Sequence, residues 1–350
     1  MINALTYLIR RGYTQLRTEV FSLPSRTIML VGALVLLLLP LYSTDPYLMR
    51  IIIMASIFAI FAASWDLLAG FTGQVNFGHA LFFGLGAYGS SLLNHHFGLS
   101  PWITMPIGAV IATLGGVLVG IPCLRLRGSY LSLATLAFPL ILTGILFAFP
   151  EFSGGELGIS GIRRLFVKPV HNYYAAVILM LVLCFIMWKI STSNTGLIFH
   201  AIREDEVAAR ASGINTKRYK LLAFALSAFF AGIAGAFFAH FIRIAGPSTL
   251  EVALSFQAVI WGIFGGVATI YGPIVAVFIL YPLTEAVAVF PELREFRLLI
   301  LAVVVLLVLL FMPQGLTPWL RDKIESICQR CKNRNVFWRR ECRICSTAMH

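Results

Sequence analysis

Long apolar runs alternate with short polar intervals along most of this chain. A helix needs about 20 predominantly apolar residues to cross the hydrocarbon core of a bilayer, and about ten segments approach that length. These segments are residues 28–42, 48–69, 77–95, 102–122, 130–149, 172–190, 219–241, 254–270, 272–290 and 297–313. The pattern predicts an all-α polytopic membrane protein with about ten transmembrane helices, in a transmembrane domain over residues 28–318.

The composition supports this class. The chain is 59% hydrophobic and 12% charged, with a mean hydropathy of +0.87, which excludes an ordinary soluble domain. Residues 1–27 contain four arginines and Pro24, and no small-x-small cleavage site follows Leu39. We therefore expect residues 1–27 to be a cytoplasmic lead-in rather than a cleaved signal.

The distribution of Lys and Arg predicts the orientation. With the N-terminus inside, the cytoplasmic segments hold 20 of the 27 basic residues. Cytoplasmic loops of membrane proteins are enriched in Lys and Arg, so both termini are expected in the cytoplasm. The net charge of +12 then follows from topology and from contact with an anionic lipid bilayer, and it requires no nucleic acid.

The longest polar interval between spans, residues 191–218, contains a charged stretch. Residues 201–215 read AIREDEVAARASGIN, which predicts one short helix that ends at Gly213. Glu206 and Arg210 lie four residues apart, so they are expected to pair on one helix face. An ordered charged helix between spans indicates a docking surface, although a solvated amphipathic linker has the same charge pattern.

Two glycine-rich stretches interrupt the apolar pattern. Residues 70–88 read GFTGQVNFGHALFFGLGAY, and residues 262–273 read GIFGGVATIYGP. Glycines alone indicate close helix packing, but polar side chains at membrane depth usually face a cavity or a partner. Interrupted segments in both halves of a transporter indicate a central pathway. The candidate pathway residues are Asp66, Gly73, Gln74, Asn76, Gly78, His79, Gly265 and Gly266.

Two acidic residues near these stretches have alternative interpretations. Asp66 precedes the first stretch and could equally reach the membrane interface. Glu285 lies within a later span, where a buried hydrogen-bonded carboxyl and a substrate contact are equally compatible with the sequence.

Several of these stretches resemble one protein family. The chain is similar to the permease subunits of ATP-driven importers for branched-chain amino acids, specifically the larger of the two permeases. The matching stretches run in order from about residue 48 to 318: GFTGQVNFGHALFFGLGAY, LRLRGSYLSLATL, SGGELGI, AIREDEVAARASGIN with TKRYKLLAFALSAFFAGIAGA, GGVATIYGP and FMPQGL. Asn76 stands where this family often has serine, and related permeases carry urea, short amides or sugars.

The resemblance implies a division of labour. The helix Ala201–Gly213 would be the coupling helix, seated in a groove of a separate ABC ATPase. Its candidate coupling residues are Ala201, Arg203, Glu204, Asp205, Glu206, Ala209 and Gly213. The other implied partners are a second permease subunit, in a heterodimer, and an external solute-binding protein, at a prokaryotic cytoplasmic (inner) membrane. The chain has no GxxxxGK[ST] loop, so we expect a non-enzyme that needs no cofactor for transport.

The tail, residues 319–350, departs from this family. It carries Cys328-x2-Cys331-x10-Cys342-x2-Cys345 in a basic segment. Two C-x2-C pairs in a reducing compartment favour a four-thiolate zinc site of the zinc-ribbon kind over disulfides. The ten-residue spacing is shorter than the usual ribbon spacing, so a redox-sensitive tail and an unstructured basic tail remain alternatives.

Two other transport classes remain open. In a secondary transporter driven by protons or ions, Asp66, His79 and Glu285 could form a relay. That class does not explain an ordered charged cytoplasmic helix. A channel is the third possibility, but the sequence has no filter-like loop or repeated charged ring.

Overall fold

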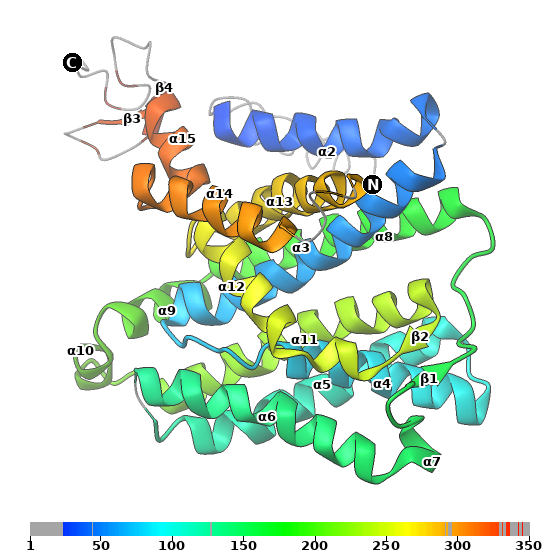
Figure 1. Ribbon diagram of the computed structural model, residues 1–350. Coiled ribbons are helices and arrows are strands. Elements are labelled where there is room, and N and C mark those ends of the chain that lie inside the picture. Colours follow the sequence, from blue (N-terminus) through cyan, green and yellow to red (C-terminus); the bar gives the residue numbers. More distant parts are fainter. Residues whose placement is uncertain are drawn as a thin grey trace, which may run out of the picture. The chain divides into compact units, whose positions relative to one another are not determined.

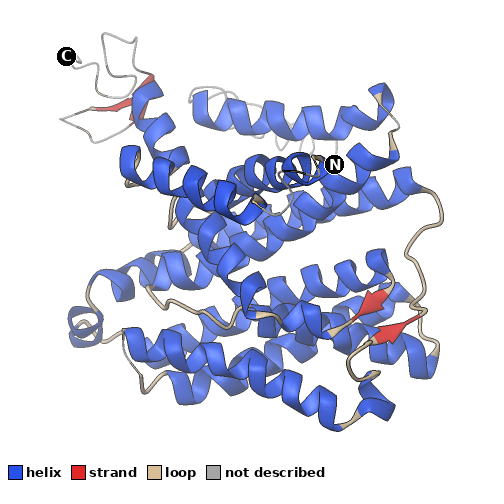
Figure 2. Ribbon diagram, viewed as in Figure 1, coloured by secondary structure: helices blue, strands red, loops and turns tan. Residues whose placement is uncertain are grey.

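The computed structural model describes residues 24–43, 45–126, 128–290, 292, 296–328, 331, 334–336, 342 and 345. Most of these residues lie in helices, and the strands are few and short (Figure 2). Most of the expected lead-in, residues 1–23, lies outside the described residues. The chain divides into two compact units, one of Thr44–Leu316 and one of the terminal segments Met1–Ser43 and Thr317–His350.

The larger unit contains the long helices (Figure 1). They are α3 (Pro46–Thr72), α4 (Ala80–Phe97), α5 (Pro101–Cys123), α6 (Ser129–Ala148), α8 (Pro169–Ser191), α11 (Thr216–Ile242), α12 (Val252–Gly265), α13 (Tyr271–Val289) and α14 (Arg297–Phe311). Its short helices are α7 (Pro150–Ser153), α9 (Asn194–Glu204), α10 (Glu206–Ala211) and the 3-10 turn η2 (Pro247–Leu250). Strands β1 (Ile159–Ser160) and β2 (Ile244–Ala245) pair antiparallel, with Ile159 opposite Ala245.

The terminal unit is smaller. Helix α2 (Pro24–Tyr42) comes from the N-terminal segment, and α15 (Leu316–Ile324) begins at the division between the units. Strands β3 (Glu325–Ile327) and β4 (Arg334–Val336) form an antiparallel hairpin in which Ser326 faces Asn335.

Each of the ten apolar segments coincides with a helix, so the protein is a polytopic helical membrane protein. Six helices in the described part of the chain, α3, α5, α6, α8, α11 and α13, are long and apolar enough to cross a bilayer alone. The other four expected spans correspond to helices that are shorter or more polar, namely α2, α4, α12 and α14. Helix α12 ends at Gly265, five residues before the expected boundary at 270, because Gly266 and Ala268 have positive φ angles.

Helix α3 is the centre of the larger unit. In its most apolar window 89% of the residues are buried, whereas the corresponding share is 28% for α6 and for α13. Helix α3 is apolar on all sides, which is expected of a helix surrounded by others. It packs against α8, α11, α12 and α13.

Glycines bring α4, α5 and α11 close together. A Cβ at Gly86 of α4 would overlap the backbone of Gly232 of α11, and a Cβ at Gly235 would overlap the carbonyl of Phe83. Small residues permit this close approach of helices in membranes. Packing therefore explains the glycines in the second half of the stretch Gly70–Tyr88.

Candidate functional site

The first interruption, residues 73–79, is called the first break. Helix α3 ends where Gly73 adopts a left-handed conformation with φ of +70°, and α4 begins at Ala80. The backbone between them makes no regular helix, so its polar groups need other partners inside the protein. Those partners are side chains from α3, α6 and α12.

Helix α6 supplies hydroxyl groups to the first break. Thr135 Oγ1 accepts from the N–H of Phe77 at 3.1 Å, and Ser132 Oγ donates to the carbonyl of Val75 at 3.1 Å. The backbones come so close that a Cβ at Gly78 would overlap the carbonyl of Thr135. Gly78 therefore has a packing reason to be glycine.

Two further side chains bond to the middle of the first break and to the start of α4, which follows it. Trp65 of α3 donates its Nε1–H to the carbonyl of Asn76 at 2.8 Å. Ser255 of α12 accepts from the N–H of Ala80 at 2.8 Å through its Oγ. The first break is thus bonded to elements before and after it in the sequence.

The polar side chains of the first break point into the protein. Gln74, Asn76 and His79 are all buried. His79 Nε2 lies 2.9 Å from Ser64 Oγ, and Asn76 Oδ1 accepts from the N–H of Gly78 at 2.8 Å. The structure gives these residues neighbours within the protein, and their predicted role in a pathway remains a prediction.

The second interruption, residues 266–270 between α12 and α13, is called the second break. Gly266 has φ of +110° and Ala268 has φ of +62°, which frees their neighbouring backbone groups from helical bonding. The carboxylate of Asp66 accepts from the N–H of Ala268 at 2.7 Å and from that of Thr269 at 2.9 Å. Gly265 is required here because a Cβ would overlap the carbonyl of Gly272.

The side chain of Asp66 is fully buried within the protein. It connects the central helix α3 to the second break. His79 contacts Ser64 rather than Asp66, so the structure does not bring these two members of the alternative proton relay into one hydrogen-bonded pair.

The polar interval contacts the end of α3. Arg203 of α9 donates from Nη1 to the carbonyl of Gly70 at 2.7 Å. The rings of His200 and Phe71 meet edge to face at 4.9 Å. Burial, and then the charge of Arg203, lower the pKa of His200, which favours the neutral ring beside the phenyl group.

The expected single helix Ala201–Gly213 is wrong, because two helices meet at Asp205. Helix α9 begins earlier, at Asn194, and α10 covers only Glu206–Ala211. Asp205 has an extended backbone, and its Oδ1 accepts from the N–H groups of Val207 and Ala208 at 2.8 and 3.0 Å. This is N-capping, and the preference of Asp for that position starts a new helix.

The other local predictions for this interval are confirmed. Arg210 pairs with Glu206 at 2.8 Å, and Lys220 of α11 reaches the other carboxylate oxygen at 2.6 Å. Partial burial acts to raise the pKa of Glu206, but the hydrogen bonds and charges of Lys220 and Arg210 outweigh it and lower the pKa. Gly213, with φ of +84°, ends α10.

The end of α10 is a Schellman motif. The N–H of Gly213 bonds to the carbonyl of Arg210 at 3.0 Å, and the N–H of Ile214 bonds to that of Ala209 at 3.2 Å. This pair of bonds closes a helix with a left-handed residue, which glycine adopts without strain. Both ends of α10 are therefore fixed by the chain itself.

Comparison with known proteins identifies the family. The family of permease components of branched-chain amino acid transport systems matches residues 47–309. That range holds both breaks, α9 and α10. The chain belongs to this family of permeases.

Relatives of this permease support the assignment. The high-affinity branched-chain amino acid transport system permease protein LivM of Escherichia coli (strain K12) is 30% identical over 298 residues, which are 77% of this chain and 69% of the relative. LivM of Salmonella typhimurium is also 30% identical, over 78% of this chain and 70% of the relative. A probable branched-chain amino acid transport permease protein LivH of Methanocaldococcus jannaschii is 24% identical over 60% of this chain and 70% of the relative. No solved structure matches the chain.

Sequence reasoning missed the residues that hold the breaks of this permease. They are Ser64, Trp65, Ser132, Thr135 and Ser255. One signal was available, because Ser132 and Thr135 lie in the LRLRGSYLSLATL stretch that carries the family resemblance. Hydroxyl groups within apolar spans are otherwise common, since Ser and Thr can bond to the preceding turn of their own helix.

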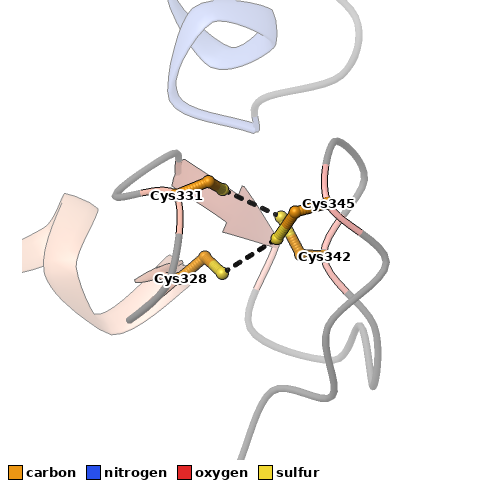
Figure 3. Close-up of side chains that lie close together, drawn as sticks. All are labelled: Cys328, Cys331, Cys342 and Cys345. Carbon is orange, nitrogen blue, oxygen red and sulfur yellow. Dashed lines mark hydrogen bonds between the residues drawn. The ribbon is translucent and has the colours of Figure 1, made fainter.

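Four cysteines of the tail form a side-chain cluster. The four cysteines Cys328, Cys331, Cys342 and Cys345 lie together, with all four Sγ atoms within 4.8 Å of one another (Figure 3). Thiol groups in such a set can bind a metal ion. The prediction from spacing that these four residues converge is confirmed.

Proposed function

We propose that this chain is the membrane-spanning permease subunit of an ATP-driven importer. It moves branched-chain or other apolar amino acids across the prokaryotic cytoplasmic membrane. Family membership supports the transport class, and the names of the LivM relatives support the substrate class. The observation that carries the mechanism is the hydrogen bond from Arg203 to the carbonyl of Gly70.

Helices α9 and α10 form the proposed docking surface for a cytoplasmic ABC ATPase. The capping of α10 by Asp205 and Gly213 makes the unit rigid. Two apolar side chains on this polar unit are exposed, Leu197 at 71% and Val207 at 67%. Exposed apolar groups on a charged, rigid helix suit a groove on a partner. The proposed coupling residues remain Ala201, Arg203, Glu204, Asp205, Glu206, Ala209 and Gly213.

A displacement of α9 would reach both breaks through Arg203. Arg203 binds Gly70, and Gly70 lies one helical turn from Asp66, whose carboxylate holds the second break. The first break begins three residues after Gly70, at Gly73. ATP-driven movement of the partner would thus change the end of α3 and shift the bundle between inward and outward access.

The breaks are the proposed moving parts of the pathway. They contain or adjoin the candidate residues Asp66, Gly73, Gln74, Asn76, Gly78, His79, Gly265 and Gly266. Irregular backbone within a membrane is retained where it lines protein or a pathway. A second permease subunit, as a heterodimer, and an external solute-binding protein complete the proposed assembly. Transport needs no cofactor in this scheme, and the one cofactor that we propose is a metal ion in the tail.

The test replaces Arg203 in the full assembly. Arg203→Ala removes the hydrogen bond to Gly70, whereas the control Arg218→Ala removes an exposed charge at the start of α11. Both complexes are reconstituted in liposomes with their ATPase and binding protein, and leucine uptake and ATP hydrolysis are measured. We expect Arg203→Ala to retain basal ATP hydrolysis, whereas its rate of leucine uptake should fall about tenfold or more. A tenfold change corresponds to about 1.4 kcal/mol of coupling free energy.

Two results would contradict this proposal. Wild-type leucine uptake by Arg203→Ala would remove Arg203 from the coupling route. Uptake that continues without ATP and follows a proton gradient would assign the chain to the ion-coupled transporters. Competition with urea and short amides in the same assay separates the related substrate class from branched-chain amino acids.

A further inference from the structure

The four tail cysteines come from two separate segments. Cys328 and Cys331 lie between strands β3 and β4, and Cys342 and Cys345 follow β4. Figure 3 shows the side chains converging from both segments. The Sγ atoms of Cys328 and Cys345 are 3.5 Å apart, and those of Cys331 and Cys342 are 3.4 Å apart.

We propose that this cluster is a structural zinc site with four thiolate ligands. A tetrahedron with Zn–S bonds of about 2.3 Å has S–S edges of about 3.8 Å. The observed separations, from 3.4 Å to at most 4.8 Å, bracket that edge. A disulfide needs sulfur atoms at about 2.05 Å and joins only two at a time. All four sulfur atoms instead share one small volume.

The architecture of the tail supports a structural role for the ion. The β3–β4 hairpin has three paired positions, from Glu325 opposite Val336 to Ile327 opposite Arg334. A two-stranded hairpin is at best marginally stable in water, and a short segment cannot bury enough apolar surface to fix itself. A metal ion bound between the hairpin loop and the following segment supplies the missing stabilisation.

The charge of the tail suits this centre. Four thiolates around a divalent cation leave a formal charge of −2. The chain after residue 320 has eight Lys and Arg residues and three Asp and Glu residues, so its net positive charge offsets a negative centre. None of the residues in the breaks or in α9 and α10 belongs to the proposed site.

The first experiment measures metal directly. The full chain is purified with its partners in mild detergent, and zinc and iron are quantified per chain by mass spectrometry. We expect a single zinc for the wild type. Cys328→Ser and Cys342→Ser, one from each pair, should each lower the bound zinc about tenfold or more. The matched controls are Cys123→Ala and Cys184→Ala, which replace buried cysteines of α5 and α8 and should retain the ion.

A second measurement identifies the ligands. Cobalt exchanged into the protein should give visible d–d bands and thiolate charge-transfer bands, which the two Ser variants lose. Alkylation should label Cys328, Cys331, Cys342 and Cys345 only after a chelator is added. Labelling of all four thiols in untreated protein without bound zinc would overturn the proposal. Iron in place of zinc, or disulfides among the four residues, would also overturn it. Neither the metal analysis nor the alkylation measures leucine uptake. A result that overturns the zinc site would therefore leave the proposed transport function untouched.

Discussion

The two breaks meet the same requirement in different ways. In the first break, hydroxyl and indole groups from α3, α6 and α12 each bond to one backbone group. In the second break, a single carboxylate, that of Asp66, accepts two backbone N–H groups. Hydrogen bonds to charged groups are stronger than neutral ones. Within the second break Thr269 Oγ1 also donates to the carbonyl of Gly266, but both bonds to α3 come from the one carboxylate of Asp66. The bonds to the first break come from several side chains.

The largest expected effect follows from removing that one residue. Asp66→Ala leaves two buried N–H groups without an acceptor, at about 1–3 kcal/mol each, or about 2–6 kcal/mol in total. We expect a large drop in the midpoint of thermal unfolding in detergent and complete loss of leucine uptake. The unfolding midpoint of Asp66→Asn should lie between those of the wild type and Asp66→Ala, because the amide oxygen of Asn can still accept one of the two hydrogen bonds. An unchanged unfolding midpoint for Asp66→Ala would show that the second break has other support.

A backbone clash tests the first break. The Cβ of Gly78→Ala would overlap the carbonyl of Thr135, and neither backbone can move without breaking the bonds beside it. Overpacking of this kind costs about 1–3 kcal/mol. Gly144→Ala in α6 is the matched control, since a Cβ there meets nothing within 4 Å. The control should be neutral or slightly stabilising, and equal midpoints for the two variants would contradict the close approach.

Removing one neutral bond from the first break should have a smaller effect. Trp65→Phe preserves much of the ring but removes the donor to the carbonyl of Asn76. We expect a loss of about 1–2 kcal/mol and reduced but measurable uptake. Trp102→Phe, at a 57% exposed position of α5, is the control in the same unfolding assay. If Trp65→Phe abolished uptake as completely as Asp66→Ala, the distributed support of the first break would be refuted.

The smallest expected effect comes from Glu206, a carboxylate with several donors that is partly exposed to water. Its pKa is lowered in the folded protein, so its stabilisation is present above the unfolded pKa. That stabilisation is lost as the pH falls through the lowered value. We expect about 0.2–1 kcal/mol at most, because solvent screens such pairs. The protection factors of the α10 amides, which correct for the intrinsic exchange rate at each pH, should therefore fall slightly at acid pH, and Glu206→Gln should remove this dependence.

The spans could be predicted from the sequence because a membrane leaves the backbone few choices. Every polar backbone group in the bilayer must be bonded, so long apolar runs become helices. Gly73 and Gly266 interrupted the pattern visibly, and both proved to have positive φ angles. The convergence of the four cysteines followed from their spacing.

The partners inside the breaks could not be predicted in the same way. Asp66 and Ala268 are 202 positions apart, and no local pattern connects a carboxylate with a distant backbone N–H. The division at Asp205 was missed for another reason. The charged stretch has continuous helical composition, and only the capping bonds to Val207 and Ala208 show where one helix stops and the next begins.

The separation in sequence between Asp66 and its two backbone donors has a consequence for biogenesis. Ribosomes add about 5–20 residues per second, so Ala268 and Thr269 emerge roughly 10–40 s after Asp66. Helices α8 and α11, which pack against α3 in the folded protein, are synthesised during that interval, whereas α13 follows it. Asp66 lies nearer the C-terminal end of α3 than its middle, where an unbonded carboxylate can stay hydrated at the membrane surface. Withdrawal of Asp66 from water would then follow the synthesis and insertion of α12 and α13, which flank the two donors.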